Sequence, residues 1–373
     1  MMNPQRKELL PFLELVRAGL WENEVRISQY EPIDYKEVYR FAQEQSVVGL
    51  VAASLEYVKD TKIPSEVALT FAGEALQLEQ RNKAMNHFIA ALDEKMQDVG
   101  IFALLVKGQG VAQCYERPLW RACGDVDYLL DRENYQKAKD YFSSIAQLNE
   151  ENEYNLHQSL FIKPWEVELH GTMRSQLFKK VEKEVDASQD DTFKNQLFRT
   201  WNNDGRLVYL LSPDNDCFFV FVHILQHFFK RGIGLRQICD WCRLLWTYRE
   251  QIDIKLLEER ISRAGLISEW NAFSSFVVEY LGMPLEAMPL YSPAKKWKKK
   301  AQQIMHIVLR TGNFGHNKDY SYYWKYPRFV QKIISLLRHT EDSLHHLFVF
   351  PLDTIRVWSR IVTYGFAQAI KGK

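Results

Sequence analysis

Apolar residues recur at intervals of three and four along the first 95 residues of the chain. The stretches "RKELLPFLELVRAGLW" (6–21) and "DYKEVYRFAQEQSVVGLVAASLEYV" (34–58) both follow this period. A third stretch starts at Pro64-Ser65-Glu66 and runs to Gly100, with start and stop signals typical of a helix. This period predicts amphipathic helices, which we expect to pack as an antiparallel bundle.

The pattern changes at residue 101. The short apolar run 101–106 ends at a Lys-Gly pair and predicts a buried strand, and residues 125–131 alternate between polar and apolar side chains. Residues 155–163 and 165–171 also alternate, on the two sides of Pro164. Alternation on both sides of a turn predicts an antiparallel hairpin.

Helical segments complete the expected fold. Short amphipathic patterns predict helices at 111–115 and 132–146, and the helical period returns after residue 216. A loop rich in Gly and Tyr interrupts that period at 310–327. We therefore expect an α+β protein with a small mixed-sheet core between two all-helical regions. The expected division is 1–98 for the N-terminal helical region, 99–212 for the core and 213–373 for the C-terminal helical domain.

Composition narrows the class of protein, although it leaves nucleic-acid binding through a local patch open. The formal net charge of +1 gives no global field that would attract nucleic acid or an acidic partner. Five cysteines in 373 residues fit a reducing compartment better than a disulfide framework. The most apolar window, 217–229, is too short to span a bilayer and contains two histidines. We expect a soluble, cytoplasmic protein.

Asp125 and Asp127 are the first candidate site residues. Two apart on a strand, they leave the same face about 6.6 Å apart along the chain. Two neighbouring carboxylates are costly unless a cation lies between them, and this spacing lets both reach one metal ion or a pair of ions. Glu166, Glu168 and His170 share one face of the later strand, so Glu168 can meet the aspartates if the two strands pair.

Oxygen ligands of this kind favour Mg²⁺ or Mn²⁺ with phosphate as a further ligand. The Gly108/Gly110 turn lies between a strand and a helix, where backbone N–H groups can hold a phosphate. Lys107 and Arg121 are cations close to this turn in the sequence. Together these residues predict metal-assisted phosphoryl or nucleotidyl transfer, with a carboxylate removing the proton of the attacking hydroxyl.

Two blocks of sequence resemble a known family. The run "LLVKGQGVAQCYERPLWRACGDVDYLL" followed by "EVELHG", and the later block "HILQHFFKRGIGLRQICDWCRLL" (223–245), are similar to the uncharacterised nucleotidyltransferase family of the polymerase-β-like superfamily. The resemblance spans residues 104 to about 245. It implies transfer of a nucleoside monophosphate from a nucleoside triphosphate to an acceptor hydroxyl, with release of pyrophosphate. The acceptor stays open among a small molecule, a sugar, a protein side chain and an RNA end, and a protein partner is also possible.

The resemblance implies roles for individual residues. The metal ligands, for Mg²⁺ or Mn²⁺, are Asp125, Asp127 and Glu168, with Glu168 also the candidate base. The residues at the nucleotide are Lys107, Gly108, Gln109 and Arg121 from the core and His227, Arg236 and Asp240 from the helical domain. Gln109 stands where the superfamily usually has Ser or Gly, so the serine contact is absent.

Two other functions compete with this interpretation. Glycosyltransferases that use nucleotide sugars also bind a metal through a DxD motif, but they need several strands upstream of it, where this chain predicts helices. Alternatively, the same fold acts without turnover, as a nucleotide-binding or protein-binding module, and the altered Gly108-Gln109 turn favours that hypothesis.

Four smaller features have ordinary structural explanations. Arg236 and Asp240 are four apart on a helix and could form a local ion pair, although the resemblance favours a phosphate contact for Arg236. His223 and His227 are expected in the core rather than on zinc, and Cys239 and Cys242 as half-buried thiols. The basic cluster 295–300 is expected to be a solvated surface, with RNA or anionic lipid as an alternative.

Overall fold

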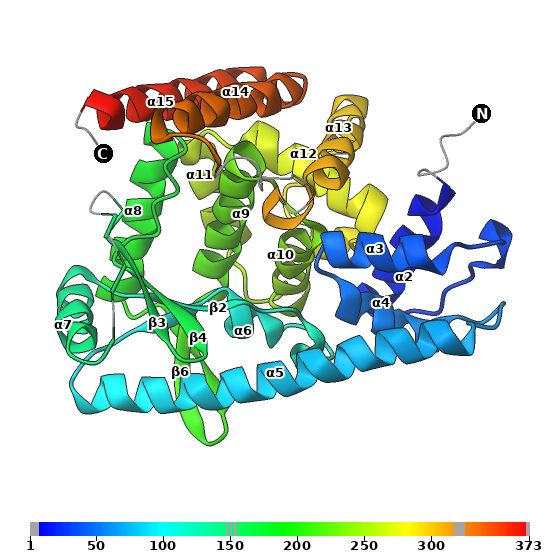
Figure 1. Cartoon of the computed structure of the whole chain (residues 1–373), viewed down its shortest axis with the longest axis horizontal. Coiled ribbons are helices and arrows are strands. Elements are labelled where there is room, and N and C mark those ends of the chain that lie inside the picture. Colours follow the sequence, from blue (N-terminus) through cyan, green and yellow to red (C-terminus); the bar gives the residue numbers. More distant parts are fainter. Residues whose placement is uncertain are drawn as a thin grey trace.

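In the computed structural model, the described residues are 7–146, 148–149, 151–152, 155–315, 317 and 325–370. Within them the chain forms a six-stranded mixed sheet flanked by helices, which confirms the α+β class (Figure 1). Part of the expected Gly/Tyr-rich loop, namely residues 316 and 318–324, lies outside the described residues. No helix in the described part of the chain combines the length and the apolar character needed to cross a membrane.

The N-terminal region is helical, as its period predicts. Its elements are α2 (Leu9–Trp21), η1 (Ser28–Tyr30), α3 (Tyr35–Glu44), α4 (Val48–Ser54), η2 (Leu55–Tyr57) and α5 (Ser65–Asp98). The carboxylate of Asp34 caps α3 by accepting from the backbone N–H groups of Lys36 and Glu37. Helix α5 is a single helix of 34 residues that runs along the base of the whole molecule in Figure 1.

The sheet forms the centre of the core. Its strands are β1 (Leu104–Val106), β2 (Asp125–Leu129), β3 (His157–Ile162), β4 (Trp165–His170), β5 (Phe198–Asn203) and β6 (Arg206–Leu211), in the order β3-β4-β2-β1-β6-β5. The predicted β3–β4 hairpin is confirmed, with Ile162 opposite Trp165 next to the turn. The other antiparallel pairs are β1 with β2 and β5 with β6. Strand β2 pairs with β4, and β1 with β6, in parallel.

Helices connect these strands. They are α6 (Gly108–Ala112), η3 (Pro118–Trp120), α7 (Arg132–Ser143) and α8 (Lys179–Lys194). Helix α6 starts at Gly108, three residues before the expected start, because the chain turns into it directly after β1. The carboxylate of Asp131 caps α7 by accepting from the backbone N–H of Asn134.

The sequence interpretation passed over the β5–β6 hairpin. Its turn is Asp204-Gly205, with φ angles of 53° and 85°. Asp-Gly with both residues at positive φ is typical of the two-residue turn that joins antiparallel strands. The signal was therefore present in the sequence, and the sheet has two more strands than the alternation up to residue 171 predicted.

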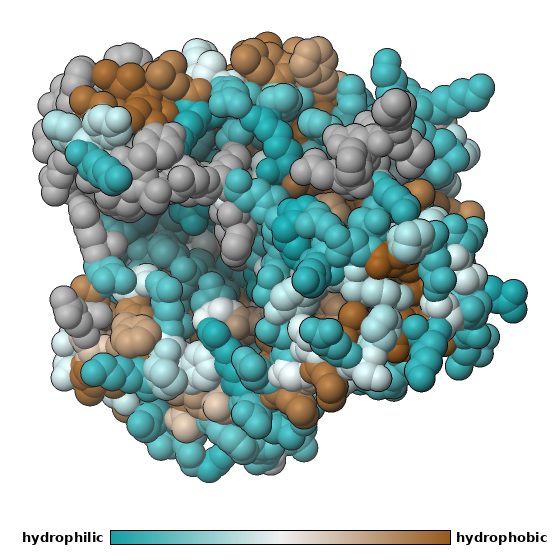
Figure 2. Space-filling view, turned by 45° about the vertical axis from the view of Figure 1, so that its right-hand side comes forward, coloured by the Kyte–Doolittle hydropathy of each residue, from teal (hydrophilic) through white to brown (hydrophobic). Residues whose placement is uncertain are grey.

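The C-terminal domain is helical. Its elements are α9 (Pro213–Lys230), α10 (Leu235–Thr247), α11 (Ile254–Ala264), α12 (Ile267–Leu281), η4 (Leu285–Ala287), α13 (Lys295–Thr311), η5 (Asn313–Gly315), α14 (Arg328–Leu347) and α15 (Pro351–Ile370). Cys239 and Cys242 are fully buried on α10 as free thiols, rather than half-buried. The apolar residues Leu337, Phe348 and Leu352 are exposed on α14–α15, where Figure 2 shows brown side chains at the top of the molecule.

Two apolar clusters determine which face of the sheet is covered and which is left for polar side chains. One lies between the sheet and helices α5 and α7, and includes Met85, Tyr128 and Phe142. The other joins the N-terminal helices to α9–α13, so that Phe12 and Phe221 belong to the same cluster. With one face of β2 packed on α5, the other face is left for the polar side chains below α9 and α10.

The expected limits of the core coincide with element ends. Helix α5 ends at Asp98, and α9 begins at Pro213. Packing nevertheless crosses both limits, because the second half of α5 forms a common core with the sheet, and Val106 and Leu211 share a cluster with α9. The division into three folding units stays a prediction.

Candidate active site

Three carboxylates meet on two adjacent strands. In the parallel pair β2–β4, Asp127 lies directly opposite Glu168, and Asp125 lies opposite Glu166. Asp125 and Asp127 point to the same side of β2, while Val126 and Tyr128 are buried on the other side. The conditional prediction that Glu168 meets the aspartates across the sheet is confirmed.

The turn after β1 brings a cation to the same face. Lys107 has a φ of 57°, a backbone conformation that residues other than Gly rarely adopt, and Gly108 follows with a φ of 38°. This turn packs against the start of β2, where a Cβ on Gly108 would lie 3.1 Å from Cys123 Sγ. From this position Lys107 Nζ donates to Asp127 Oδ1 at 2.9 Å.

The charges of the three carboxylates interact strongly. Burial opposes ionisation of Asp127, but Lys107 and His170 outweigh it and hold its pKa below the usual value. Burial likewise opposes ionisation of Glu168, whose pKa is nevertheless held well below its usual range by His157, His170 and Lys107. The negative charge of Asp127, followed by burial, raises the pKa of Asp125 to about 6. One carboxylate therefore lacks full compensation, which is what a site for a cation requires.

The donor set fits the implied metal. Asp125, Asp127 and Glu168 offer oxygen atoms alone, and Mg²⁺ and Mn²⁺ prefer such ligands. A divalent cation would remove the repulsion that raises the pKa of Asp125.

Two histidines extend the carboxylate cluster. His170 Nε2 lies 2.7 Å from Asp127 Oδ1 and 3.4 Å from Glu168 Oε2. His157 Nε2, on the neighbouring strand, lies 3.2 Å from the same Glu168 oxygen. The sequence interpretation placed His170 on this face but missed His157. The signal that could have found it is the hairpin register, because both histidines lie equally far from the turn and pair directly.

Arg121 and Asp240 join the core to the helical domain. Arg121 Nε and Nη2 donate to Asp240 Oδ1 and Oδ2 at 3.1 and 2.6 Å, and the Tyr115 hydroxyl donates to Oδ1 at 2.8 Å. The side chains of Arg121 and Asp240 are almost completely buried. The ion pair of Asp240 is thus with Arg121 of the core rather than with its helical neighbour Arg236. Arg236 Nη1 donates to the carbonyl of Ala122 at 2.8 Å, which is a second link to the segment before β2.

Helix α9 contributes neutral histidines. Burial, followed by the charge of Lys107, lowers the pKa of His227 to about 3. The same two causes lower the pKa of His223 well below its usual value, and the two rings lie 4.4 Å apart. At neutral pH these side chains are therefore hydrogen-bonding groups and not cations.

The three carboxylates, the histidines and the arginines described above line one cleft of about 380 Å³. Of the predicted site residues, the structure brings nine into its lining: Lys107, Gly108, Arg121, Asp125, Asp127, Glu168, His227, Arg236 and Asp240. Arg174, Lys230 and Arg231 add positive groups. The cleft thus combines a cluster of carboxylates with several cations, a combination that suits a metal-bound polyphosphate.

Gln109 is the predicted residue that the structure places elsewhere. Its side chain is 1% exposed and points away from the cleft, toward α5. There Gln109 Nε2 donates to Asn82 Oδ1 at 2.8 Å. Asn82 in turn donates to the carbonyls of Leu119 and Arg121, so Gln109 supports the segment that carries Arg121.

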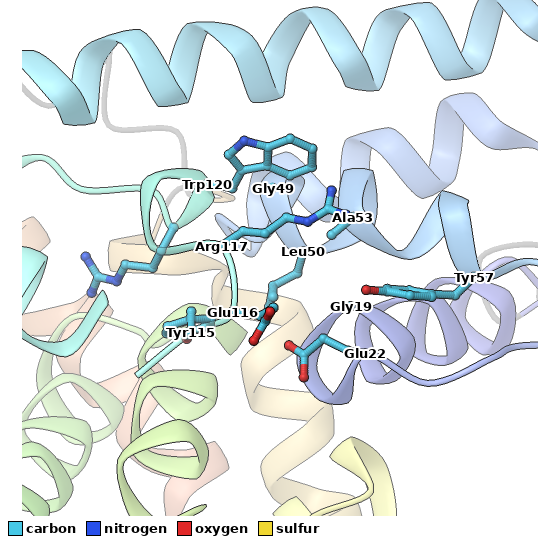
Figure 3. A pocket seen from close by; sticks show the side chains of 11 residues that line it. Gly19, Glu22, Gly49, Leu50, Ala53, Tyr57, Tyr115, Glu116, Arg117 and Trp120 are labelled. Atoms are coloured by element: carbon cyan, nitrogen blue, oxygen red, sulfur yellow. The ribbon is translucent and has the colours of Figure 1, made fainter. Parts of the chain in front are cut away.

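A second, much smaller pocket lies on the other side of this segment. It has a volume of about 20 Å³ and is lined by Gly19, Gly49, Arg117 and Trp120 among others. Figure 3 shows its side chains coming from the N-terminal helices and the 115–120 segment. Arg121 lines both this small pocket and the cleft, and so connects the two.

Comparison with known protein families identifies the family of this chain. A family model described as "Uncharacterised nucleotidyltransferase" matches residues 31–279, which is more than half of the chain. Among solved structures, the chain is similar to an antigenic nucleotidyltransferase-like protein from Paracoccidioides brasiliensis, with 14% identity and a TM-score of 0.32; the match covers 53% of this chain and 92% of that one. No curated protein matches the chain. On the extent of the family match, the chain belongs to the uncharacterised nucleotidyltransferase family.

Proposed function

We propose that this protein transfers a nucleoside monophosphate from a nucleoside triphosphate to an acceptor hydroxyl and releases pyrophosphate, in a reaction that depends on Mg²⁺ or Mn²⁺. The observation that carries the proposal is the register of β2 and β4, which puts Asp127 opposite Glu168 and Asp125 on the same face. These carboxylates lie in a cleft with several cations, and family membership supports nucleotidyl transfer in general.

The residues of the cleft divide into three roles. Asp125, Asp127 and Glu168 would hold the ion, which when bound would neutralise phosphate charge and act as a Lewis acid. Lys107 and Arg236 would bind phosphate oxygens, with Lys230 and Arg231 further along the cleft. Glu168 is the candidate base for the proton of the acceptor hydroxyl. His223 and His227, being neutral, would act as hydrogen-bonding groups beside the substrate.

Arg121 and Asp240 are assigned a positioning role in this proposal. Their charges are paired with each other, although both line the cleft. The pair fixes the segment that leads into β2, and it thereby orients the two aspartates.

A specific observation favours a second candidate, a nucleotide-binding protein without turnover. The side chain of Gln109 points away from the cleft, and Asp127 already contacts both Lys107 and His170. Such a protein would bind a nucleotide or a protein partner through the same cleft. A glycosyltransferase has less support, because residues 7–98 form helices and one isolated bridge, between Val25 and Val58, instead of parallel strands.

The cytoplasm is the proposed compartment. All five cysteines are buried as free thiols, which supports a reducing environment.

Thermal unfolding with ligands tests the proposed function. The wild type should be stabilised by one nucleoside triphosphate together with Mg²⁺ or Mn²⁺, by about 2.7 kcal/mol at a ligand concentration 100 times the Kd. Asp125→Asn should lose the metal-dependent part of this shift while keeping its fold. A matched control is Asp140→Asn, which makes the same change at an exposed position on α7 and should respond like the wild type.

Pyrophosphate release distinguishes the two candidates. We would measure it with sugars, small alcohols, protein and RNA ends as acceptors. Release that disappears in Asp125→Asn supports the transferase, whereas metal-dependent binding without release supports the binding protein. An unchanged ligand-induced shift in Asp125→Asn would show that the carboxylates do not hold the metal.

A further inference from the structure

Two imidazoles and one carboxylate converge at the edge of the cleft. His157 on β3 and His170 on β4 are direct cross-strand neighbours, and their rings lie 4.9 Å apart. Both turn their Nε2 atoms toward Glu168 Oε2, at 3.2 and 3.4 Å. One ligand atom from each of the three residues lies within 4.8 Å of the other two. Two rings therefore point at one oxygen from neighbouring strands.

These distances match a metal site. Ligand atoms about 2.0–2.2 Å from an ion lie roughly 3.0–3.5 Å from one another in tetrahedral or octahedral geometry. Two of the three separations are already in this range. The third, between the two rings, is at most 4.8 Å and can close by a small rotation of the partly exposed His157 side chain.

The chemistry of the donors differs from that of the aspartates. Mg²⁺ prefers oxygen ligands, whereas two histidines with one carboxylate are typical of zinc and other divalent transition metals. All three side chains also line the cleft, so the remaining coordination positions would face a substrate. We propose that His157, Glu168 and His170 bind a divalent transition-metal ion such as Zn²⁺ or Mn²⁺. This site shares Glu168 with the site of Asp125 and Asp127, and its other two ligands are different.

The site has a defined place in the molecule. Asp127 Oδ1 lies 2.7 Å from His170 Nε2, so the site adjoins the carboxylates proposed to hold Mg²⁺. His157 lies at the far end of the cluster, on the outermost strand of the sheet. The proposal of this metal site does not depend on nucleotidyl transfer, because its tests measure metal binding directly.

Zinc affinity is the first test. We would titrate the metal-free full-length protein with Zn²⁺ by calorimetry, after confirming by thermal unfolding that each variant is folded. The wild type should bind one Zn²⁺, and His157→Gln should weaken this binding at least about tenfold, because even groups that only support metal ligands contribute that much. The matched control is His87→Gln, which removes an exposed histidine paired with Asp204 and should leave the affinity unchanged.

Nitrogen coordination is the second test. Pulsed electron paramagnetic resonance of bound Mn²⁺ detects ¹⁴N coupling when imidazole is a ligand. We expect this coupling in the wild type and in Asp125→Asn, with a reduced signal in His157→Gln. Equal Zn²⁺ affinity in wild type and His157→Gln, or Mn²⁺ bound to Asp125→Asn without ¹⁴N coupling, would overturn the proposal.

The two proposals can fail separately. If Asp125→Asn keeps its ligand-induced shift while Zn²⁺ binding depends on His157, the proposed function fails and the histidine site stands. If His157→Gln binds Zn²⁺ normally while Asp125→Asn loses nucleotide binding, the histidine site fails alone.

Discussion

Arg121 and Asp240 exemplify how tertiary structure decides the role of a single charged residue. On the sequence alone, Asp240 has a plausible partner one helical turn away in Arg236. In the fold its partner is 119 residues distant, on the segment before β2. The pair is buried and bidentate, and the Tyr115 hydroxyl also donates to it. Loss of the Asp240 carboxylate would therefore leave the Arg121 guanidinium in the interior without a counter-charge.

We predict a large effect of Asp240→Ala on stability. Removing one partner of a buried pair should lower the free energy of unfolding by about 3–5 kcal/mol, because Arg121 stays buried without its counter-charge. The measurement is urea unfolding at pH 7. Glu56→Ala breaks a similar but exposed pair with Arg117 and should cost about 1 kcal/mol or less. Equal effects of the two changes would contradict the positioning role.

At the scale of single residues, the carboxylates of the site could be predicted from the sequence, whereas their hydrogen-bond partners could not. Asp125, Asp127 and Glu168 follow from alternation on two strands, because strand geometry fixes which side chains share a face. The bond from Lys107 to Asp127, by contrast, depends on a turn with positive φ, which the Lys-Gly pair does not specify. Gln109 was assigned to the nucleotide through the family resemblance, whereas in the fold its side chain donates to Asn82.

At the scale of elements, the close approach of α4 to the 115–120 segment depends on glycine. A Cβ on Gly49 would lie 1.9 Å from the carbonyl oxygen of Trp120, far inside any normal contact. Figure 3 shows Gly49 and Trp120 together at the small pocket beside this contact. The same segment continues to Arg121, so α4 indirectly supports the cleft.

Gly49→Ala should therefore destabilise the protein. We expect a loss of about 1–3 kcal/mol, because the backbone of α4 or of the segment must move to relieve the overlap. Gly73→Ala on α5 is the control, since a Cβ there meets nothing within 4 Å and should stabilise the helix by up to about 1 kcal/mol. Thermal unfolding of the two variants measures the difference. If Gly49→Ala left the stability unchanged, the spacing between α4 and the 115–120 segment would be adjustable.

Helix α5 carries a buried acid beneath the sheet. Asp93 is 4% exposed, and burial raises its pKa to about 6, with the Tyr128 hydroxyl only partly offsetting the rise. The folded protein therefore holds a proton that the unfolded chain releases at lower pH. Its contribution to stability is present below pH 4 and is lost as the pH rises through 6.

Asp93→Asn should remove this pH dependence. At pH 8 we expect the variant to be more stable than the wild type by on the order of 1–3 kcal/mol, with the two converging near pH 4. Urea unfolding at several pH values measures the effect. Asp98→Asn, at the exposed end of the same helix, should shift stability by less than about 0.5 kcal/mol at every pH.

The elements themselves were largely predictable where a period is long or a turn is marked. The N- and C-terminal helices and the β3–β4 hairpin follow from periods of about 3.6 and 2. Strand order could not be read in this way. The sequence contains no local signal that β6 pairs in parallel with β1, because that contact joins residues more than 100 positions apart through nonlocal packing.

At the scale of the whole molecule, the N-terminal helices are bound to the C-terminal domain. Arg17 donates to the carbonyls of Tyr280 and Glu279 at 2.8 and 2.7 Å, and Trp21 Nε1 donates to that of Leu281 at 2.5 Å. These contacts, with the apolar cluster that contains both Phe12 and Phe221, join the N-terminal helices to the C-terminal domain.

We predict that these two regions open together. Native-state hydrogen exchange should give the same opening free energy for the slowest amides of α2 and α12, because neither helix can leave without exposing the shared cluster. If the amides of α2 exchange through an opening that is several kcal/mol cheaper, the N-terminal helices form an independent unit.

The length of α5 has a mechanical consequence. At 1.5 Å per residue, its 34 residues extend about 51 Å, and one end packs on the N-terminal helices while the other packs under the sheet. A pulling force applied between these two regions would act along the backbone hydrogen bonds of one continuous rod, in addition to any interface. The two regions therefore cannot swing about a flexible linker at this side of the molecule, and the helix sets their spacing.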